Sequence, residues 1–139
     1  MDIHLPPTNT RVSLNTSDRV KRKIAQKTDS NVKKYIGLSG KDIAQRIDAL
    51  NHEWDTERTL EANFGLVMLV SSLLGYTVNK KWFALGGIAS LFMLQHAIQG
   101  WCPPLTAVRH LGVRTVEEIN QEKESLQKML SRNPDFQIY

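Results

Sequence analysis

The feature that most constrains the fold is a dense apolar block between residues 62 and 102. From Ala62 to Val78 the chain has no Asp, Glu, Lys, Arg or His, and from Trp82 to Cys102 the only ionisable side chains are His96 and Cys102. Outside the block, nearly every second or third residue is polar or charged. A soluble helical bundle spreads its core residues along all of its helices. The block is therefore typical of membrane-spanning helices.

Both halves of the block fall within the length range of a membrane span, the second comfortably and the first only marginally. Ala62–Val78 has 17 residues, about 25 Å of helix, and Trp82–Cys102 has 21 residues, about 31 Å. A hydrocarbon core of about 30 Å needs about 20 residues, within a range of about 17–25. The linker Asn79–Lys81 is too short for anything except an antiparallel turn. The sequence therefore predicts a two-helix transmembrane hairpin; the alternative is the buried core hairpin of a soluble protein.

Aromatic and small residues support the hairpin. Trp82 lies beside the linker, Trp101 lies at the opposite end and Trp54 precedes the first span, and such amphipathic rings favour the membrane interface. Pairing the helices about the turn places residues whose numbers sum to about 159 at equal depth. The small-residue pairs Ser71-x-x-x-Gly75 and Gly86-x-x-x-Ser90 then overlap, which lets the two backbones approach closely.

The flanking regions predict helices and no strands, so the predicted fold class is all-α. The predicted segments are a disordered lead (1–17), an amphipathic helical region (18–61), the transmembrane hairpin (62–102) and a C-terminal amphipathic helix with its tail (103–139). Thr115 and Glu118 form a capping box for a final helix over Val116–Ser131. Ser39 with Asp42 resembles a second capping box, and the helix that follows meets no Pro or Gly before Ala62, so it is expected to run into the first span.

The first predicted helix, Asp18–Ile36, has two interpretations. Its apolar positions Val20, Ile24, Val32 and Ile36 form a narrow stripe surrounded by lysines and arginines. A helix of this kind suits the surface of an anionic membrane. The alternative is a solvated helix that docks on another part of the protein.

The charge distribution bears on partners and orientation. Of the 18 basic residues, 11 precede Ala62, two lie in the linker and five follow Cys102. Outside the linker they are interleaved with carboxylates, so no nucleic-acid partner is predicted. The first eleven residues contain no signal-peptide apolar run. Counting positive charges predicts that both termini are cytoplasmic.

Four polar residues near the far end of the hairpin form a candidate intramembrane cluster: Asn63, Gln95, His96 and Gln99. The equal-depth rule places His96 opposite Asn63. An ionisable residue inside a membrane is a functional candidate by default. The favoured interpretation is structural, with hydrogen bonds across the hairpin or a homodimer interface. Since the spans offer His96 no second histidine or carboxylate, no metal and no cofactor are predicted.

Cys102 is the only cysteine and the candidate reactive thiol. It stands at a predicted membrane boundary, where water would reach it, and Arg109, His110 and Arg114 follow. Nearby positive charge lowers a thiol pKa and makes the group reactive. The alternative is an inert interfacial cysteine. The chain has no Cys-x-x-Cys, Gly-rich phosphate loop, His-Glu-x-x-His or Gly-x-Ser-x-Gly motif, so no motif supports catalysis.

The stretch Gly100-Trp101-Cys102-Pro103-Pro104-Leu105, followed by Leu111-Gly112-Val113-Arg114-Thr115, resembles the ending of the YgaP-like inner-membrane transmembrane domains. The resemblance covers roughly residues 50–130. It implies a bacterial two-helix membrane hairpin that associates as a dimer and is fused in some members to a sulfurtransferase-type rhodanese domain. This chain has no rhodanese domain and no second cysteine, so sulfur transfer is not carried over.

Together these features favour a non-enzymatic membrane anchor or interaction protein of the bacterial inner membrane. Its expected partners are the lipid bilayer, a second copy of the chain and an unidentified membrane protein. The alternative is a small redox or sulfur-handling membrane component that acts through Cys102.

Overall fold

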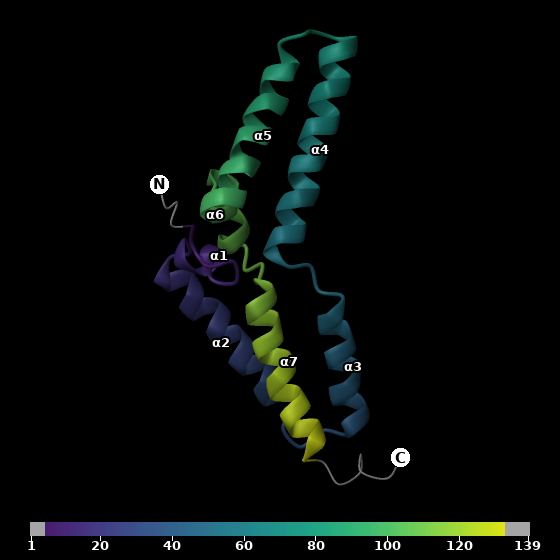
Figure 1. Cartoon of the computed structure of the whole chain (residues 1–139). Coiled ribbons are helices and arrows are strands. Elements are labelled where there is room, and N and C mark those ends of the chain that lie inside the picture. Colours follow the sequence, from purple (N-terminus) through teal and green to yellow (C-terminus); the bar gives the residue numbers. More distant parts are fainter. Residues whose placement is uncertain (1–4, 133–139) are drawn as a thin grey trace. The chain divides into compact units, whose positions relative to one another are not determined.

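The computed structural model describes residues 5–132, which form helices and no strand. The helices are α1 (Arg11–Leu14), α2 (Asp18–Lys34), α3 (Gly40–Asn51), α4 (Thr56–Thr77), α5 (Trp82–Gln99), α6 (Pro103–His110) and α7 (Val116–Ser131), as labelled in Figure 1. They fall into two compact units. Unit 1 holds α1, α4, α5 and α6, and unit 2 holds α2, α3 and α7. The all-α prediction is confirmed.

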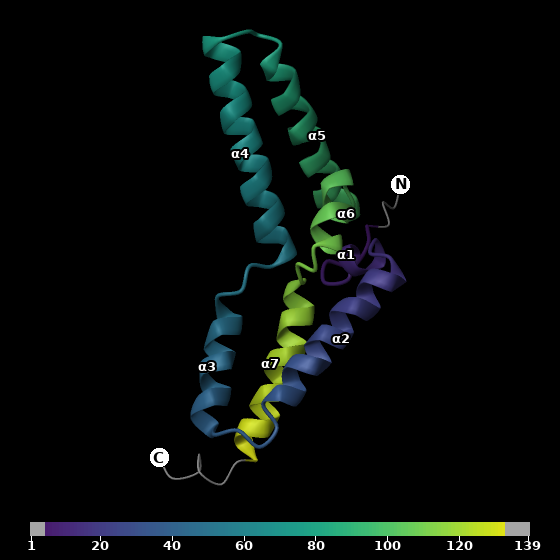
Figure 2. The ribbon, with the colours of Figure 1, turned by 180° about the vertical axis from the view of Figure 1, so that it is seen from behind.

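The core of unit 1 is the antiparallel pair α4 and α5, which run side by side in Figures 1 and 2. The two small-residue patches meet as their spacing predicts. A Cβ atom added to Gly86 would lie 2.6 Å from Ser71 Oγ, and one added to Gly75 would lie 2.9 Å from the Phe83 ring. Glycine at these two positions therefore allows the helices their close approach.

The helix lengths differ from those predicted from hydropathy. α4 has 22 residues, about 33 Å, and α5 has 18, about 27 Å. The first helix, which was predicted to be the shorter of the two, is therefore the longer. α4 begins at Thr56, before the apolar block, and α5 ends at Gln99 because Gly100 adopts a left-handed conformation (φ +71°). Capping and backbone conformation set these limits, whereas hydropathy only marks the apolar part of each helix.

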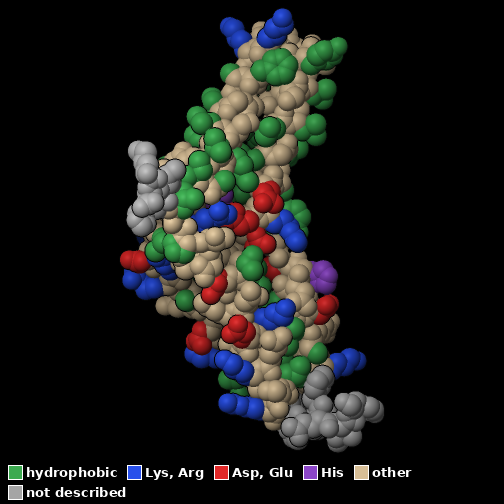
Figure 3. Space-filling model, in the orientation of Figure 1, with side chains coloured by type: hydrophobic (Ala, Val, Ile, Leu, Met, Phe, Trp, Pro, Cys, Tyr) green, Lys and Arg blue, Asp and Glu red, His purple; other side chains and the backbone are tan. Residues whose placement is uncertain are grey.

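Within residues 5–132, one range, Gly40–Thr77, which comprises α3, the short break after it and α4, holds a segment long and apolar enough to cross a membrane. Only 22% of that segment is buried, whereas the core helix of a soluble protein is mostly buried. Figure 3 shows hydrophobic side chains along the outside of the α4–α5 pair and basic side chains at its loop end. The exposed side chains include Leu66, Leu69 and Leu73 on α4 and Ile88, Leu91 and Leu94 on α5.

The open end of the hairpin, opposite the loop, is closed by α1 and α6. Val12, Leu60, Phe64, Cys102 and Leu105 form a buried cluster there. The prediction of a disordered lead over residues 1–17 is therefore wrong for its second half, because α1 packs into this core. The prolines at 103 and 104 also start a helix, since proline suits the first turn, where no N–H partner is needed.

Unit 2 consists of α2, α3 and α7, and α7 packs against both of the others. Ile43, Leu50, Ile119 and Leu126 form its core. α7 has the predicted limits, and the capping box of Thr115 and Glu118 is present. Ser39 accepts the predicted hydrogen bond from the Asp42 N–H, but its own hydroxyl donates to the Asp42 carboxylate, so only half of that box forms.

The structure bears on two other predictions: the continuation of the Ser39-capped helix into the first span, and the two interpretations of the first helix. α3 does not continue into α4: it ends at Asn51, with His52 as its C-cap, and α4 starts at Thr56 directly after Asp55. Asp is a favoured residue immediately before a helix, which explains the restart without Pro or Gly. In α2, Val20 and Ile24 are buried within the protein. The structure therefore favours the docked interpretation of this helix over one that lies on a membrane.

Candidate functional site

A buried polar cluster joins α1, α4 and α5 at the open end of the hairpin. His96 is 1% exposed, and its Nε2 lies 2.8 Å from Glu57 Oε2. Arg11 Nη2 donates to Glu57 Oε1 at 3.2 Å, and Arg11 Nη1 donates to the Ala97 carbonyl oxygen at 3.0 Å. Glu57 thus accepts from two cationic or polar partners on two other helices.

The charge balance of this cluster favours an ionised Glu57. The hydrogen bond with His96 lowers the pKa of Glu57, burial opposes it, and Arg11 adds a further lowering, so the pKa lies below the ordinary value of 4.5. Among the described residues, His96 Nδ1 and Arg11 Nε are buried and have no hydrogen-bond partner. Buried polar atoms without partners are costly. Within residues 5–132, both side-chain atoms of this kind belong to this cluster.

Gly100 makes room for α1 beside this cluster. A Cβ atom there would lie 2.6 Å from Arg11 Cβ and 2.8 Å from its carbonyl carbon, and the left-handed φ already disfavours a side chain. Asn15 Nδ2 donates to the Gln99 carbonyl oxygen at 3.0 Å, which ties the end of α1 to the end of α5. Glycine at position 100 is therefore what lets Arg11 reach Glu57.

The predicted intramembrane cluster is only partly assembled. Asn63 does not face His96: it is exposed, and its Nδ2 donates to the Thr59 carbonyl oxygen of its own helix at 2.7 Å. Gln95 is half-buried and Gln99 is exposed. Pairing residues whose numbers sum to about 159 predicts their position along the hairpin axis, but it does not predict the direction in which a side chain points. Asn63 is offset by about 100° from Phe64, which faces the core.

Cys102 is not the water-accessible thiol that its boundary position suggested. It is 0% exposed, lies in the apolar cluster of unit 1 and occupies the N-cap position of α6. The neighbouring Arg109 is also buried and is used structurally: Nη1 donates to the Val113 carbonyl oxygen at 2.7 Å and Nε donates to Thr16 Oγ1 at 3.1 Å. This environment is that of a packed core cysteine.

The three tryptophans predicted as interface anchors are all exposed. Trp82 is the first residue of α5, next to the hairpin loop, and Trp101 follows its last turn. Trp54 lies in the non-helical segment between α3 and α4. Trp82 also lines a shallow hollow of about 240 Å³ with Asn79, Lys81 and Leu85.

Unit 2 holds a second polar network, around Glu122 of α7. Its carboxylate is 0% exposed and accepts from Arg46 Nε at 2.9 Å and Nη2 at 2.7 Å, from Asn31 Nδ2 at 3.3 Å, and from Arg114. Arg114 also donates twice to the Glu53 carboxylate, at 2.8 and 2.6 Å. Burial alone would raise the pKa of Glu122, but these hydrogen bonds outweigh it and hold the pKa below its ordinary value.

The sequence carried a signal for this network that hydropathy reading missed. Glu122 lies on the apolar face of α7, three residues after Ile119 and four before Leu126. A carboxylate within such a stripe requires buried partners. Glu57 and Arg11 were missed for a different reason: both lie outside the apolar block, and only the tertiary fold brings them to His96.

The residues of the stretches Gly100–Leu105 and Leu111–Thr115 have structural roles in this fold. Gly100 and Gly112 both adopt positive φ, Cys102 caps α6 from within the core, Pro103 begins α6 and Thr115 caps α7. No cluster of three or more His, Cys, Asp or Glu side chains suited to a metal occurs within the described residues. No protein-family model matches the chain, and no curated protein or solved structure is significantly similar to it.

Proposed function

We propose that the chain is an integral protein of the bacterial inner membrane and that the α4–α5 pair is its anchor. The observation that carries this proposal is the direction of the apolar side chains. Ser71, Gly75 and Gly86 lie in the contact between the two helices. Leu69 and Leu91, near the midpoints of the helices, are 69% and 62% exposed. An apolar surface of this length on a helix pair suits hydrocarbon rather than water.

The ends of the hairpin fit the two interfaces of a bilayer. Lys80, Lys81 and Trp82 lie at the loop end, and Trp101 lies at the other end beside the Arg11–Glu57–His96 cluster. Tryptophan and lysine are typical of the zones where a helix leaves the hydrocarbon. Between these ends, no Asp, Glu, Lys or Arg interrupts residues 62–78 or 82–99. Both helices are therefore proposed to cross.

Two crossings place both ends of the chain on one side. The linker carries two basic residues and the rest of the chain carries 16, so the positive-inside tendency assigns the termini to the cytoplasm. Unit 2 is then a cytoplasmic helical module held at the membrane. We propose that its role is interaction with a protein partner or a second copy of the chain rather than catalysis, in keeping with the resemblance to the YgaP-like domains.

Alkaline carbonate extraction tests the anchor. The wild-type chain is expected in the membrane pellet, together with a known integral protein. The variant Leu69→Asp/Leu91→Asp places two carboxylates at mid-depth, each costing about 2.5–3.5 kcal/mol in hydrocarbon, and is expected to leave the pellet. Because both side chains are exposed, the same variant would be tolerated by a soluble protein.

A matched control removes exposed leucines elsewhere. Leu38→Asp/Leu111→Asp changes the same residue type at exposed positions outside the proposed spans and is expected to stay in the pellet. Release of the wild-type chain by carbonate, or identical behaviour of the two double variants, would contradict the proposal.

A further inference from the structure

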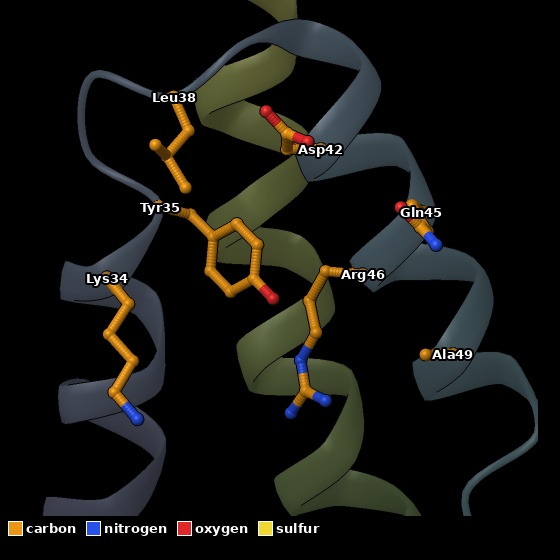
Figure 4. A pocket seen from close by; sticks show the side chains of 7 residues that line it. All are labelled: Lys34, Tyr35, Leu38, Asp42, Gln45, Arg46 and Ala49. Atoms are coloured by element: carbon orange, nitrogen blue, oxygen red, sulfur yellow. The ribbon is translucent and has the colours of Figure 1, made fainter.

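Unit 2 contains a hollow between α2 and α3. One cavity of about 400 Å³ is lined by Lys27, Asn31, Lys34, Tyr35, Arg46, Glu53 and Arg114. A second, of about 550 Å³, shares Lys34, Tyr35 and Arg46 with the first, so the two adjoin. Figure 4 shows the Tyr35 ring and the Arg46 guanidinium pointing into the space between the two helices, with Lys34 on the α2 side.

Each carboxylate of this hollow accepts a hydrogen bond, but the partner of Asp42 is a neutral hydroxyl, so the negative charge of Asp42 remains in the hollow. Glu53 accepts two hydrogen bonds from Arg114, and Asp42 accepts one from the Ser39 hydroxyl at 2.6 Å. Glu122, which is fully buried, holds Arg46 and Arg114 in place. The two arginines are thus fixed by the protein itself, and their positions do not depend on a ligand.

The lysines of the hollow are different. Lys27 and Lys34 lie seven residues apart on α2, so they share one face of the helix about two turns apart. Within the described part of the chain, neither ammonium group lies within 4.0 Å of a carboxylate, whereas Lys33 on the same helix pairs with Asp29 at 2.6 Å. Lys27 and Lys34 are therefore the cations of the hollow without a carboxylate partner among the described residues. With four cations against three carboxylates (Asp42, Glu53 and Glu122), the hollow keeps a net charge of +1.

We propose that this hollow binds the phosphate group of a small phosphomonoester, with Lys27 and Lys34 as its cationic ligands and the Tyr35 hydroxyl as a hydrogen-bond donor. Lysine supplies a point charge and three donors, which suits a phosphate dianion. The adjoining cavity adds Leu38, Gln45 and Ala49, so it accommodates the organic part of the ligand. The phosphate belongs either to a soluble compound or to a lipid headgroup such as that of phosphatidic acid.

Binding is tested on the full chain purified in a neutral maltoside detergent. Thermal unfolding is followed as inorganic phosphate is added, with sodium chloride at matched ionic strength as the reference. A second series uses mixed micelles that contain dioleoylphosphatidic acid or, as the reference, dioleoylphosphatidylcholine. A saturable rise in Tm above the reference in the first series supports a soluble phosphate, and a rise confined to the second supports a lipid headgroup.

The variants assign the effect to the hollow. Lys27→Gln/Lys34→Gln is expected to weaken the apparent affinity at least tenfold, and Tyr35→Phe severalfold. Lys23→Gln/Lys41→Gln removes the same charge from exposed lysines that do not line the hollow and is expected to leave the affinity unchanged. All of the substituted lysine side chains are exposed, and far-UV circular dichroism verifies that the variants keep their helices.

Two results would overturn the proposal. One is the absence of a saturable response to either probe in the wild-type chain. The other is an equal loss of response in the two lysine double variants, which would show that net charge alone attracts phosphate. A response to an acidic peptide but to neither phosphate probe would likewise reject a phosphate site and assign the lysines to a protein partner.

Discussion

His96 Nε2 lies 2.8 Å from Glu57 Oε2, a contact that joins the last turn of α5 to the first turn of α4. It sits at the end of the proposed anchor where the chain leaves the apolar segment. Because Glu57 also accepts a hydrogen bond from Arg11, the buried His96–Glu57 pair connects α1, α4 and α5 at the open end of the hairpin.

Glu57→Ala is expected to lower the free energy of unfolding by about 1–3 kcal/mol, because it leaves the buried His96 Nε2 without its partner and leaves Arg11 with the Ala97 carbonyl oxygen alone. The measurement is reversible unfolding in detergent, followed by circular dichroism. Asn63→Ala, six residues away on an exposed position of the same helix, is the matched control and is expected to change stability by less than about 0.5 kcal/mol. Equal effects of the two substitutions would contradict this role of Glu57.

Gly100→Ala is expected to destabilise unit 1 by about 1–3 kcal/mol, since the position requires a left-handed backbone that a Cβ disfavours and the new Cβ meets the backbone of Arg11. Gly87→Ala, on α5 with nothing within 4 Å of its added Cβ, is expected to be neutral or slightly stabilising. Unfolding midpoints of the two variants give the comparison. A Gly100→Ala protein as stable as Gly87→Ala would show that α1 does not pack as described.

Cys102 is expected to resist a water-soluble maleimide near neutral pH until the protein is unfolded, because its side chain has no exposed surface. Labelling is measured by mass spectrometry with and without denaturant. A cysteine introduced at the exposed Gln127 of the Cys102→Ala background reports the rate for an accessible thiol. Rapid labelling of Cys102 in the folded chain would instead support the redox or sulfur-handling alternative.

The fold could be predicted from the sequence wherever a local pattern decides it. The Thr115–Glu118 capping box and the period of Ile119 and Leu126 predict α7 to the residue, and the small residues at 71, 75 and 86 predict the contact between α4 and α5. The α7 pattern depends on residues within a few helical turns, and the α4–α5 contact depends on the single short loop that joins the two helices. The helix α1 was not predicted, because a helix of four residues is too short to show an apolar periodicity.

The candidate sites could not be predicted in the same way, because their contacts join residues that are far apart in the sequence. Arg11 and Ala97 are 86 residues apart, and Arg46 and Glu122 are 76 apart. Position within a span was a poor guide, because Asn63 and Gln99 are exposed whereas Glu57, outside the apolar block, is the partner of His96. A polar residue on an apolar helix face, as with Glu122, was the more informative signal.

Glu122 is expected to make unit 2 sensitive to acid. Its folded pKa lies below the ordinary value of 4.5, so its stabilising contribution is complete above that value and is lost as pH falls through the folded pKa. Glu122→Gln leaves Arg46 without its carboxylate partner and Arg114 with Glu53 alone. It is expected to cost about 3 kcal/mol near neutral pH, with a flatter loss of stability below pH 4.5. Thermal unfolding from neutral to acid pH measures both effects. Glu124→Gln, on the same helix, is the control, and a wild-type acid profile in Glu122→Gln would contradict the assignment.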